Sequence, residues 1–413
     1  MARVVMLEAL AYGLDRLTEA ARRRGTELVL LTFDREYYSR QLAGNDYLRV
    51  VDADTFDIDA VRAALDALGD VSGLISNTDT WAGTAETLAE ERGFPNVLRD
   101  VRRLRDKVWV RNQVADAGLS TGRAVRGSDW AALAGSGHLP AEPVLRIVKD
   151  AEGTGSRHVR LADGTESVAD AIEELRGQHV PAERITVEPY ACGPLYSAET
   201  YTAESGTVLL GVNSRTVSEL PQFRELDLTF PIGRGSRWET DIADWVSRVL
   251  ACVRRGTGFS HVEFVHTADG FELVEVNARL GGGRIGEGIL QAGGVDPFEL
   301  LLLQATEPHI DARHLETAAR EPVAGGFAQV LKYASQDGKL GDVTGTGELG
   351  RFPGGIEWHP LRDSASLIES VDDQRACYGF LTARGPSPEI ALHRAHAAAR
   401  HLRVTGLGPS GPR

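Results

Sequence analysis

Cysteine and long apolar runs are scarce in this chain. Only three cysteines occur among 413 residues, and they are scattered, so they give neither a disulfide framework nor a CxxC zinc motif. This favours a reducing, cytoplasmic environment. No apolar run approaches the roughly 20 residues that span a bilayer, and the N-terminus lacks the pattern of a signal peptide. The sequence therefore predicts a protein with no membrane partner.

Lysine and long basic runs are also rare. The formal net charge is −14 at pH 7 and no basic cluster offsets it, so a nucleic-acid partner is not expected. Of the 45 basic residues only four are lysines. In a chain that uses arginine almost everywhere else, the positions that keep lysine need a chemical reason. They are Lys107, Lys149, Lys332 and Lys339.

Two nucleotide-binding signatures are missing. The first apolar strand runs into "LEALAYG" instead of GxGxxG, and no GxxxxGK[ST] loop occurs. A Rossmann dinucleotide cofactor and a Walker phosphate loop are therefore not expected. Residues 1–100 do contain an alternation of apolar strands and amphipathic helices, beginning with "RVVML" and "LDRLTEAARRR". Such alternation predicts a Rossmann-like parallel α/β sheet.

The elements beyond residue 100 alternate less regularly. The segment 101–121 is predicted as one helix that carries Lys107 and ends at Gly118. The stretch 213–231, "NSRTVSELPQFRELDLTFP", is predicted to be irregular. More short strands and a closing helix, "SPEIALHRAHAAARHL", follow in the tail. This composition predicts α+β structure for the rest of the chain.

The stretch "SHVEFVHTADGFELVEVNARLGGG" is predicted to form a β-hairpin. Residues 261–266 and 274–280 each alternate apolar and polar side chains, with Thr-Ala-Asp-Gly between them. A two-residue loop would place Phe264 opposite Glu275 and mix the two faces. A three-residue loop centred on Asp269 keeps the apolar face whole. This register pairs Val262 with Val276 and Phe264 with Val274.

The same register brings two acidic side chains together. Glu263 lies directly opposite Glu275, and His261 lies opposite Asn277. Opposed carboxylates repel, so a cation is expected between them. Carboxylate and amide oxygens suit Mg²⁺, and Arg279 on the same face suits a phosphate oxygen. The alternative is an amphipathic hairpin whose polar face simply lies in water.

Two lysines lie beside features that suit a phosphate. Lys149 ends a predicted strand and is followed by a small loop that contains Gly153 and Gly155, where backbone N–H groups can approach a ligand. Lys107 lies on the helix that follows the first domain. Taken singly, an ordinary turn explains the glycine loop better than a phosphate site does, and a solvated helix lysine explains Lys107 better still.

The order of these features resembles the ATP-grasp superfamily. "RDKVWVRNQVADAGLSTGRA", "SHVEF" and "EVNARLGGG" are similar to L-amino-acid ligases and related carboxylate–amine ligases of peptide and siderophore pathways. The resemblance implies a Rossmann-like N-terminal domain, a two-subdomain ATP-grasp fold and a C-terminal α+β region. The implied boundaries are 1–100, 101–187 for the lid subdomain with the glycine loop, 188–306 for the catalytic subdomain, and 307–413.

The resemblance also implies roles for individual residues. The phosphates of ATP would contact Lys107 and Lys149, under a mobile flap formed by Gly153, Thr154, Gly155 and Ser156. The adenine would lie near Glu188 and Tyr190. The ligands of Mg²⁺, which Mn²⁺ can replace, would be Glu263, Glu275 and Asn277. The transferring phosphoryl group would be held by Arg279, which also faces the substrate.

Three positions leave alternatives open. Leu195 stands where related ligases carry a ribose-binding glutamate, and Glu199 is the candidate to replace it. His261 either positions the substrate or is a structural histidine. Arg284 either binds a substrate carboxylate or is a solvated arginine.

The resemblance implies a two-step ligase reaction. A substrate carboxylate, expected to be that of an amino acid, is phosphorylated by ATP, and an amine displaces phosphate from the acyl phosphate to form an amide. Its partners would be these two small molecules and, by resemblance, a second copy of the chain in a homodimer. The alternatives are another ATP-grasp enzyme, such as a purine-pathway ligase or a carboxylase subunit, and a non-catalytic ATP sensor. The stretch 213–231 and the loop around Arg284 are expected to shape the substrate pockets.

Overall fold

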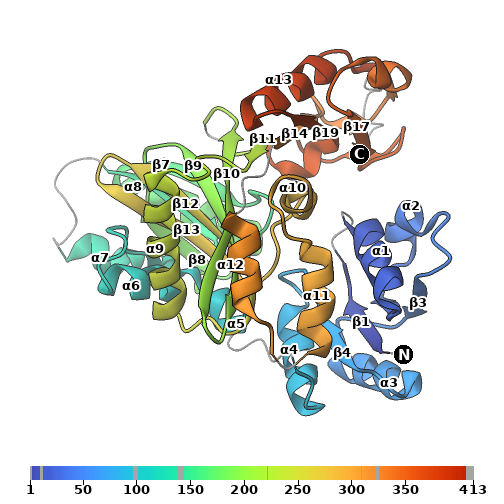
Figure 1. Ribbon diagram of the computed structural model, residues 1–413. Coiled ribbons are helices and arrows are strands. Elements are labelled where there is room, and N and C mark those ends of the chain that lie inside the picture. Colours follow the sequence, from blue (N-terminus) through green and yellow to red (C-terminus); the bar gives the residue numbers. More distant parts are fainter. Residues whose placement is uncertain are drawn as a thin grey trace.

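The computed structural model describes residues 2–9, 13–95, 101–136, 144–220, 222–307, 309–320 and 325–405. Its N-terminal part is a four-stranded parallel sheet in the order β3-β2-β1-β4, with helices packed against it (Figure 1). The predicted Rossmann-like domain is therefore confirmed. Its elements are β1 (Arg3–Leu7), α1 (Leu14–Arg24), β2 (Glu27–Thr32), η1 (Glu36–Tyr38), α2 (Ser39–Leu42), β3 (Arg49–Asp52), α3 (Ile58–Leu68), β4 (Gly73–Ile75) and α4 (Ala82–Glu91).

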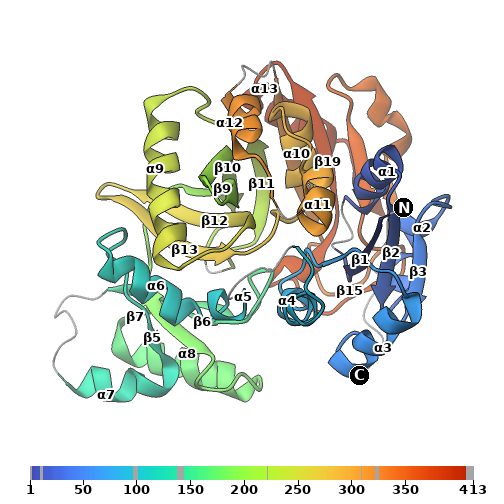
Figure 2. The same ribbon diagram turned by 60° about the horizontal axis from the view of Figure 1, so that its bottom comes forward.

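A second, smaller layer follows. Its sheet is four-stranded and antiparallel, in the order β5-β8-β6-β7, and the apolar side of α8 packs against it around Val168 and Leu175. This part lies below the large sheet in Figure 2. Its elements, with the preceding helices, are α5 (Val101–Leu104), α6 (Lys107–Asp116), β5 (Val125–Arg126), η2 (Gly127–Asp129), α7 (Trp130–Gly135), β6 (Leu145–Asp150), β7 (Val159–Asp163), α8 (Gly164–Gly177) and β8 (Ile185–Pro189).

The largest sheet has eight strands in the order β13-β12-β9-β10-β11-β14-β19-β17, and all its pairings are antiparallel. It runs without a break past residue 306, because β11 pairs with β14. Its strands and the helices of this region are β9 (Leu195–Ala203), β10 (Gly206–Val217), β11 (Glu225–Phe230), α9 (Arg237–Cys252), β12 (Gly258–Thr267), β13 (Gly270–Asn277), α10 (Ile285–Ala292), α11 (Pro297–Thr306), α12 (Ala312–Arg320) and β14 (Gly326–Tyr333).

The C-terminal region is mixed α+β, as expected. Helix α13 packs on β14 and β19 through a row of buried alanines, and two small two-stranded sheets complete the region. Among the described residues, no helix has the length and apolar character needed to cross a bilayer. The remaining elements are β15 (Gly338–Lys339), β16 (Asp342–Thr344), η3 (Thr346–Arg351), β17 (Glu357–Pro360), β18 (Leu367–Ile368), η4 (Gln374–Ala376), β19 (Cys377–Gly385), α13 (Pro388–Ala399) and β20 (Arg403–Thr405).

Two predicted elements are wrong. The single helix expected over 101–121 is broken into α5 and α6, because the carboxylate of Asp106 accepts the N–H of Trp109 and starts a new helix. The stretch 213–231 is not irregular, since most of it belongs to β10 and β11. These two strands are buried between β9 and β14, where sheet pairing overrides weak local patterning.

The predicted hairpin register is right at one end and wrong at the other. Val262 pairs with Val276 and Glu263 with Glu275, as expected. Phe264 pairs with Leu273 instead of Val274, because a β-bulge follows Glu263 and leaves Val274 as the extra residue. Leu273 therefore takes the buried position, with 1% of its surface exposed.

Candidate active site

A cavity of about 400 Å³ lies between the small antiparallel sheet, strands β12 and β13, and the end of the N-terminal domain. Most of the residues predicted for the site line it, although they come from four separate segments of the chain. They are Lys107, Lys149, Gly153, Thr154, Gly155, Ser156, Glu188, Tyr190, His261, Glu263, Glu275, Asn277 and Arg279. Two predicted residues do not line it, namely Glu199 and Arg284.

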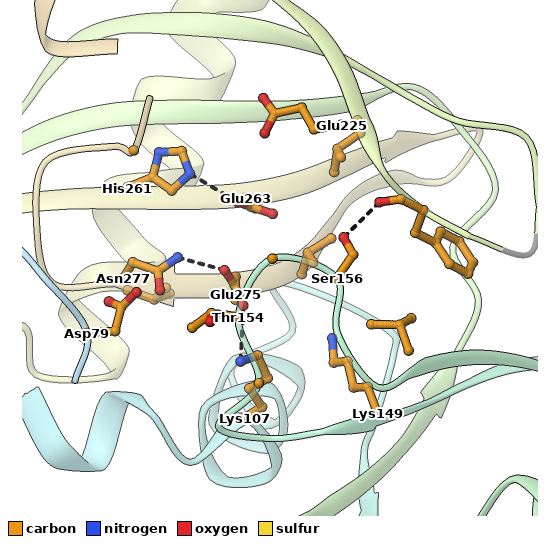
Figure 3. A pocket seen from close by; sticks show the side chains of 18 of the residues that line it. Asp79, Lys107, Lys149, Thr154, Ser156, Glu225, His261, Glu263, Glu275 and Asn277 are labelled. Atoms are coloured by element: carbon orange, nitrogen blue, oxygen red, sulfur yellow. Dashed lines mark hydrogen bonds and ion pairs between the residues drawn. The ribbon is translucent and has the colours of Figure 1, made fainter. Parts of the chain in front are cut away.

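The two lysines point into this cavity from the same side (Figure 3). Lys107 is the first residue of α6, and its ammonium lies 3.1 Å from Glu275 Oε2 and 2.8 Å from the carbonyl oxygen of Ala151. Burial would lower the pKa of Lys107, but the charge and hydrogen bond of Glu275, together with the charges of Glu188 and Asp79, raise it. Lys107 is therefore a fixed cation that already neutralises one of the opposed glutamates.

The second lysine is held by a buried carboxylate. Lys149 Nζ lies 2.6 Å from Glu188 Oε1, and burial keeps the pKa of Lys149 below its ordinary value although Glu188 opposes this. Burial alone would raise the pKa of Glu188, but the charges of Arg111 and Lys149 hold it below its usual range. Glu188 thus serves as the counter-ion of Lys149, in addition to lining the cavity.

Arg111 is a site residue that the sequence analysis missed. Its Nε lies 3.4 Å from Glu188 Oε2, its guanidinium donates to the carbonyl oxygen of Leu273, and 3% of its surface is exposed. Arg111 follows Lys107 by four residues on α6, so both side chains lie on the same face of the helix. The four-residue spacing from Lys107 was the signal in the sequence that could have identified Arg111.

The opposed glutamates form the far wall of the cavity. Each is paired with a cation of the protein, Glu275 with Lys107 and Glu263 with the guanidinium of Arg215. The amide nitrogen of Asn277 donates to Glu275 Oε1 at 2.8 Å, which turns the amide oxygen away from that carboxylate. Two carboxylates and one amide oxygen on adjacent strands fit the oxygen ligands that Mg²⁺ takes together with phosphate oxygens. No cluster of three His, Cys, Asp or Glu side chains with metal-binding geometry occurs in the described ranges, so this set would depend on Asn277 and on the nucleotide.

Arg215 is a second missed residue. It lies on β10, in the stretch predicted to be irregular, and its guanidinium is 2.8 Å from Glu225 Oε2 and 3.2 Å from His261 Nε2. Burial would lower its pKa, but the charges of Glu225 and Glu263 raise it. Burial would likewise raise the pKa of Glu263, but the charge of Arg215 holds it far below the usual range.

His261 lies at the centre of a buried hydrogen-bonded chain. Its Nδ1 is 2.6 Å from Glu199 Oε1, and its Nε2 is 3.1 Å from Glu263 Oε1. Burial would lower the pKa of His261, but the charge and hydrogen bond of Glu199 raise it to about 9. Glu199 is 1% exposed and lies behind His261, so it is not placed to touch a ribose in the cavity. A side chain on Gly281 would lie 2.9 Å from both Glu199 and His261, which explains the first glycine of "LGGG".

Arg279 reaches the N-terminal domain. Its guanidinium forms a two-pronged ion pair with Asp79, with distances of 2.8 Å and 2.7 Å. Asp79 follows β4 at the carboxyl end of the parallel sheet, where ligands of such sheets bind. Asp79 is a further site residue that was not predicted, although its position after a buried strand was a usable signal.

Arg284 lies outside the cavity and is not solvated. Its guanidinium is 2.9 Å from Glu287, 3.5 Å from Asp15 and 3.3 Å from His359 Nδ1, and 12% of its side chain is exposed. It therefore joins the N-terminal domain, α10 and the C-terminal region. Neither reading of Arg284 from the sequence describes this position.

Comparison with proteins of known structure identifies the architecture. An L-amino acid ligase from Bacillus licheniformis superposes on 99% of this chain and 99% of its own, with a TM-score of 0.80 and 17% sequence identity. The chain has the ATP-grasp fold. Two further structures agree. A phosphoribosylglycinamide synthetase from Anaerococcus prevotii superposes with a TM-score of 0.72 and 13% sequence identity, over 98% of this chain and 99% of its own. An N5-carboxyaminoimidazole synthase from Aspergillus clavatus in complex with ADP superposes with a TM-score of 0.69 and 14% identity, over 97% of this chain and 98% of its own.

Sequence comparison adds a narrower match. Residues 331–405 match the family model for L-amino acid ligase C-terminal domain 2. A protein from Sinorhizobium fredii (strain NBRC 101917 / NGR234), described as uncharacterized protein y4rH, is similar to most of this chain. It is 25% identical over 385 residues, which are 90% of this chain and 76% of the relative.

Proposed function

We propose that the protein is an ATP-dependent carboxylate–amine ligase that acts on an amino acid through an acyl phosphate and releases ADP and phosphate. The observation that carries this proposal is that two lysines, an arginine and an opposed pair of glutamates surround one cavity. The match of residues 331–405 to an L-amino acid ligase domain supports this ligase class over the other ATP-grasp enzymes.

The proposed nucleotide site lies between the small sheet and strands β12 and β13. Lys107 and Lys149 would contact the phosphates as compact point charges, and Glu188 would keep Lys149 in place. Tyr190 and Val274 line the cavity and offer apolar surface to the adenine. Because Glu199 lies behind His261, the ribose contact is not assigned to it.

The proposed metal ligands are Glu263, Glu275 and Asn277. A bound Mg²⁺ would neutralise the charge of the phosphates and polarise the bond that is broken. Glu263 and Glu275 are paired with Arg215 and Lys107, so both cations are close enough to share the negative charge of a phosphoryl group. Arg279, which Asp79 orients, would hold the transferring phosphoryl oxygens.

The remaining task of the protein in this reaction is to position the groups and exclude water. Oxide is a poor leaving group, so a carboxylate accepts an amine only after phosphorylation. Phosphoryl transfer needs little covalent help from the protein beyond positioning and charge neutralisation. The glycine loop would cover the acyl phosphate and keep water from hydrolysing it. His261, fixed by Glu199, would orient the substrate next to the phosphoryl group.

The test is a phosphate-release screen with Mg-ATP and all amino acids, singly and in pairs. We expect release with one particular pair and a loss of about 100-fold or more in Glu275→Ala, since this change removes a proposed metal ligand. Asp269→Asn, in the exposed turn of the same hairpin, is the matched control and should keep full activity.

Two results would contradict the ligase proposal. ATP binding without release for any amino acid would favour a nucleotide sensor or an enzyme with another acid as substrate. Bicarbonate-dependent release would favour a carboxylase. Release with a single amino acid would support acyl-phosphate formation and leave the amine to be found.

Two further proposals rest on resemblance and composition only. We propose a homodimer because the ligases that the chain resembles are expected to be dimers, and light scattering of the purified protein would test this. We propose a cytoplasmic location because the three cysteines are unpaired. Fractionation of cells that express the tagged full-length chain would test this second proposal.

A further inference from the structure

The glycine loop, which connects β6 and β7 and contains Gly153 and Gly155, touches the C-terminal region. Residues 371–375 form a turn between β18 and β19, and the backbone N–H of Gln374 donates to the carbonyl oxygen of Gly155 at 3.2 Å. Gln374 also lines the cavity. A segment outside both ATP-grasp subdomains therefore completes the wall around the proposed phosphate site.

The glycine loop has a conformation that needs such support. Gly155, Ser156 and His158 have φ values of 63°, 57° and 59°, in the left-handed region. This region is unfavourable for residues with a side chain, so serine and histidine stay there only when neighbouring groups hold them. Ser156 Oγ donates to the carbonyl oxygen of Phe223 at 2.7 Å, which supplies a second anchor (Figure 3).

The second anchor is also connected to the C-terminal region. Phe223 lies in the connection between β10 and β11, and its neighbour Arg224 donates from Nη1 to the carbonyl oxygen of Val371 at 2.8 Å. Gln222 Nε2 lies 3.4 Å from Asp372 Oδ1 in the same contact. The hydrogen bonds of Gly155 and Ser156 thus both lead to residues 371–375, one directly and one through this connection.

The turn itself is fixed by one buried carboxylate. Asp373 is 6% exposed, and it accepts the N–H of Arg375 at 2.9 Å together with two bonds from the Arg375 guanidinium, at 2.9 Å to Oδ1 and 2.7 Å to Oδ2. The N–H of Gln374 lies between these two residues. The direction of the Gln374 N–H is therefore fixed by contacts within the turn and does not depend on the glycine loop.

We propose that residues 371–375 act as a latch that holds the glycine loop closed over the cavity, with Gln374 as the positioning residue. The latch deepens the proposed function, because a closed loop would keep water away from an acyl phosphate. Loss of the latch is expected to raise the KM for ATP and the ratio of phosphate released to amide formed. The kcat for phosphoryl transfer should change little, since Gln374 does not belong to the charged set.

One substitution removes only the N–H of this contact. Gln374 is the first residue of η4, and Asp373 before it is extended, with φ −137° and ψ −175°, so both positions suit proline at 374. Gln374→Pro therefore deletes the donor without displacing the turn. Gln374→Ala is the matched control, because it keeps the N–H and removes the side chain. Arg375→Met removes the guanidinium that pairs with Asp373 and should loosen the turn. The Arg375 side chain is 43% exposed.

The measurement is amide hydrogen exchange of the peptide 150–158 in the free protein and with Mg²⁺ and the non-hydrolysable analogue adenylyl imidodiphosphate. We expect roughly five-fold faster exchange in Gln374→Pro, the loss expected for one hydrogen bond. Gln374→Ala should exchange at the wild-type rate, and Arg375→Met should exchange faster. With a productive substrate pair, the proline variant should show a several-fold higher KM for ATP, with kcat changed less than about twofold.

Two outcomes would overturn the latch. One is wild-type exchange in Gln374→Pro and Arg375→Met, with both proteins folded by circular dichroism. The other is equal acceleration in the proline and alanine variants, which would assign the effect to the side chain. Exchange in the free protein needs no substrate, so a failed substrate search and a failed latch give different results.

Discussion

At the scale of single residues, the cavity is held by three buried charges that act together. Arg111, Lys149 and Glu188 are each less than a tenth exposed, and their charged groups lie within 3.4 Å of a partner. A buried charge that loses its partner is costly, because water does not replace the lost interaction. The proposed phosphate contact of Lys149 therefore depends on Arg111, which pairs with the same carboxylate, Glu188.

This dependence gives a stability prediction. Arg111→Met should lower the free energy of unfolding by about 3 kcal/mol or more, because it removes one of the two cations beside Glu188 and frees the carbonyl of Leu273. Arg123→Met is the control, since it breaks an exposed ion pair with Asp116 and should cost less than about 1 kcal/mol. Urea denaturation of both variants is the measurement, and equal costs would contradict the assignment.

At the scale of elements, the hairpin of β12 and β13 carries an extra residue for a reason. Without Val274, Leu273 would precede Glu275 directly, and buried and cavity-facing side chains would alternate without interruption. The bulge leaves that alternation intact on both sides and adds an apolar side chain to the cavity wall. Val274 is therefore not needed for strand pairing.

Deletion of Val274 tests this reading. The shortened hairpin should keep the pairs of Glu263 with Glu275 and of Phe264 with Leu273, and the protein should remain folded. The affinity for ATP should fall about tenfold, because the adenine would lose one buried apolar side chain. Calorimetric titration with the non-hydrolysable analogue measures this effect. A variant that unfolds, or that binds the analogue as tightly as wild type, would contradict the prediction.

At the scale of the whole molecule, three parts of the chain meet at one charged junction. Arg284 at the start of α10 contacts Asp15 of α1 and His359 of β17, and Arg16 of α1 lies 2.6 Å from Glu287. His359 accepts from Arg284, so it is neutral there. Burial, together with the charge of Arg284, lowers the pKa of His359 to about 4.

The junction predicts a loss of stability in acid. An unfolded histidine binds a proton near its ordinary pKa of about 6.5, whereas the folded His359 does so only near 4, so the unfolded chain binds more protons between these values. The contribution of His359 to the free energy of unfolding is complete above pH 6.5. It falls by up to about 3 kcal/mol as the pH drops to 4. Urea denaturation at several pH values should show a shallower acid loss in His359→Gln. The exposed His309→Gln should keep the wild-type slope, and equal slopes in all three proteins would refute the assignment.

The sequence by itself determined the features that repeat along the chain. Alternation of strands and helices gave the parallel N-terminal sheet, and the period of two gave the pairing of Glu263 with Glu275. Lysine scarcity pointed to Lys107 and Lys149, which both line the cavity. These features are local, so a single segment contains all the information needed to read them.

Only the tertiary structure decided which residues from distant segments meet. Arg111, Arg215 and Asp79 reach the cavity from α6, β10 and the end of β4, and no local pattern marks their partners. Sheet pairing likewise turned the stretch 213–231 into strands and placed Glu199 behind His261. The physical reason is that burial and ion pairing depend on the neighbours that folding supplies, and these neighbours lie far away in the sequence.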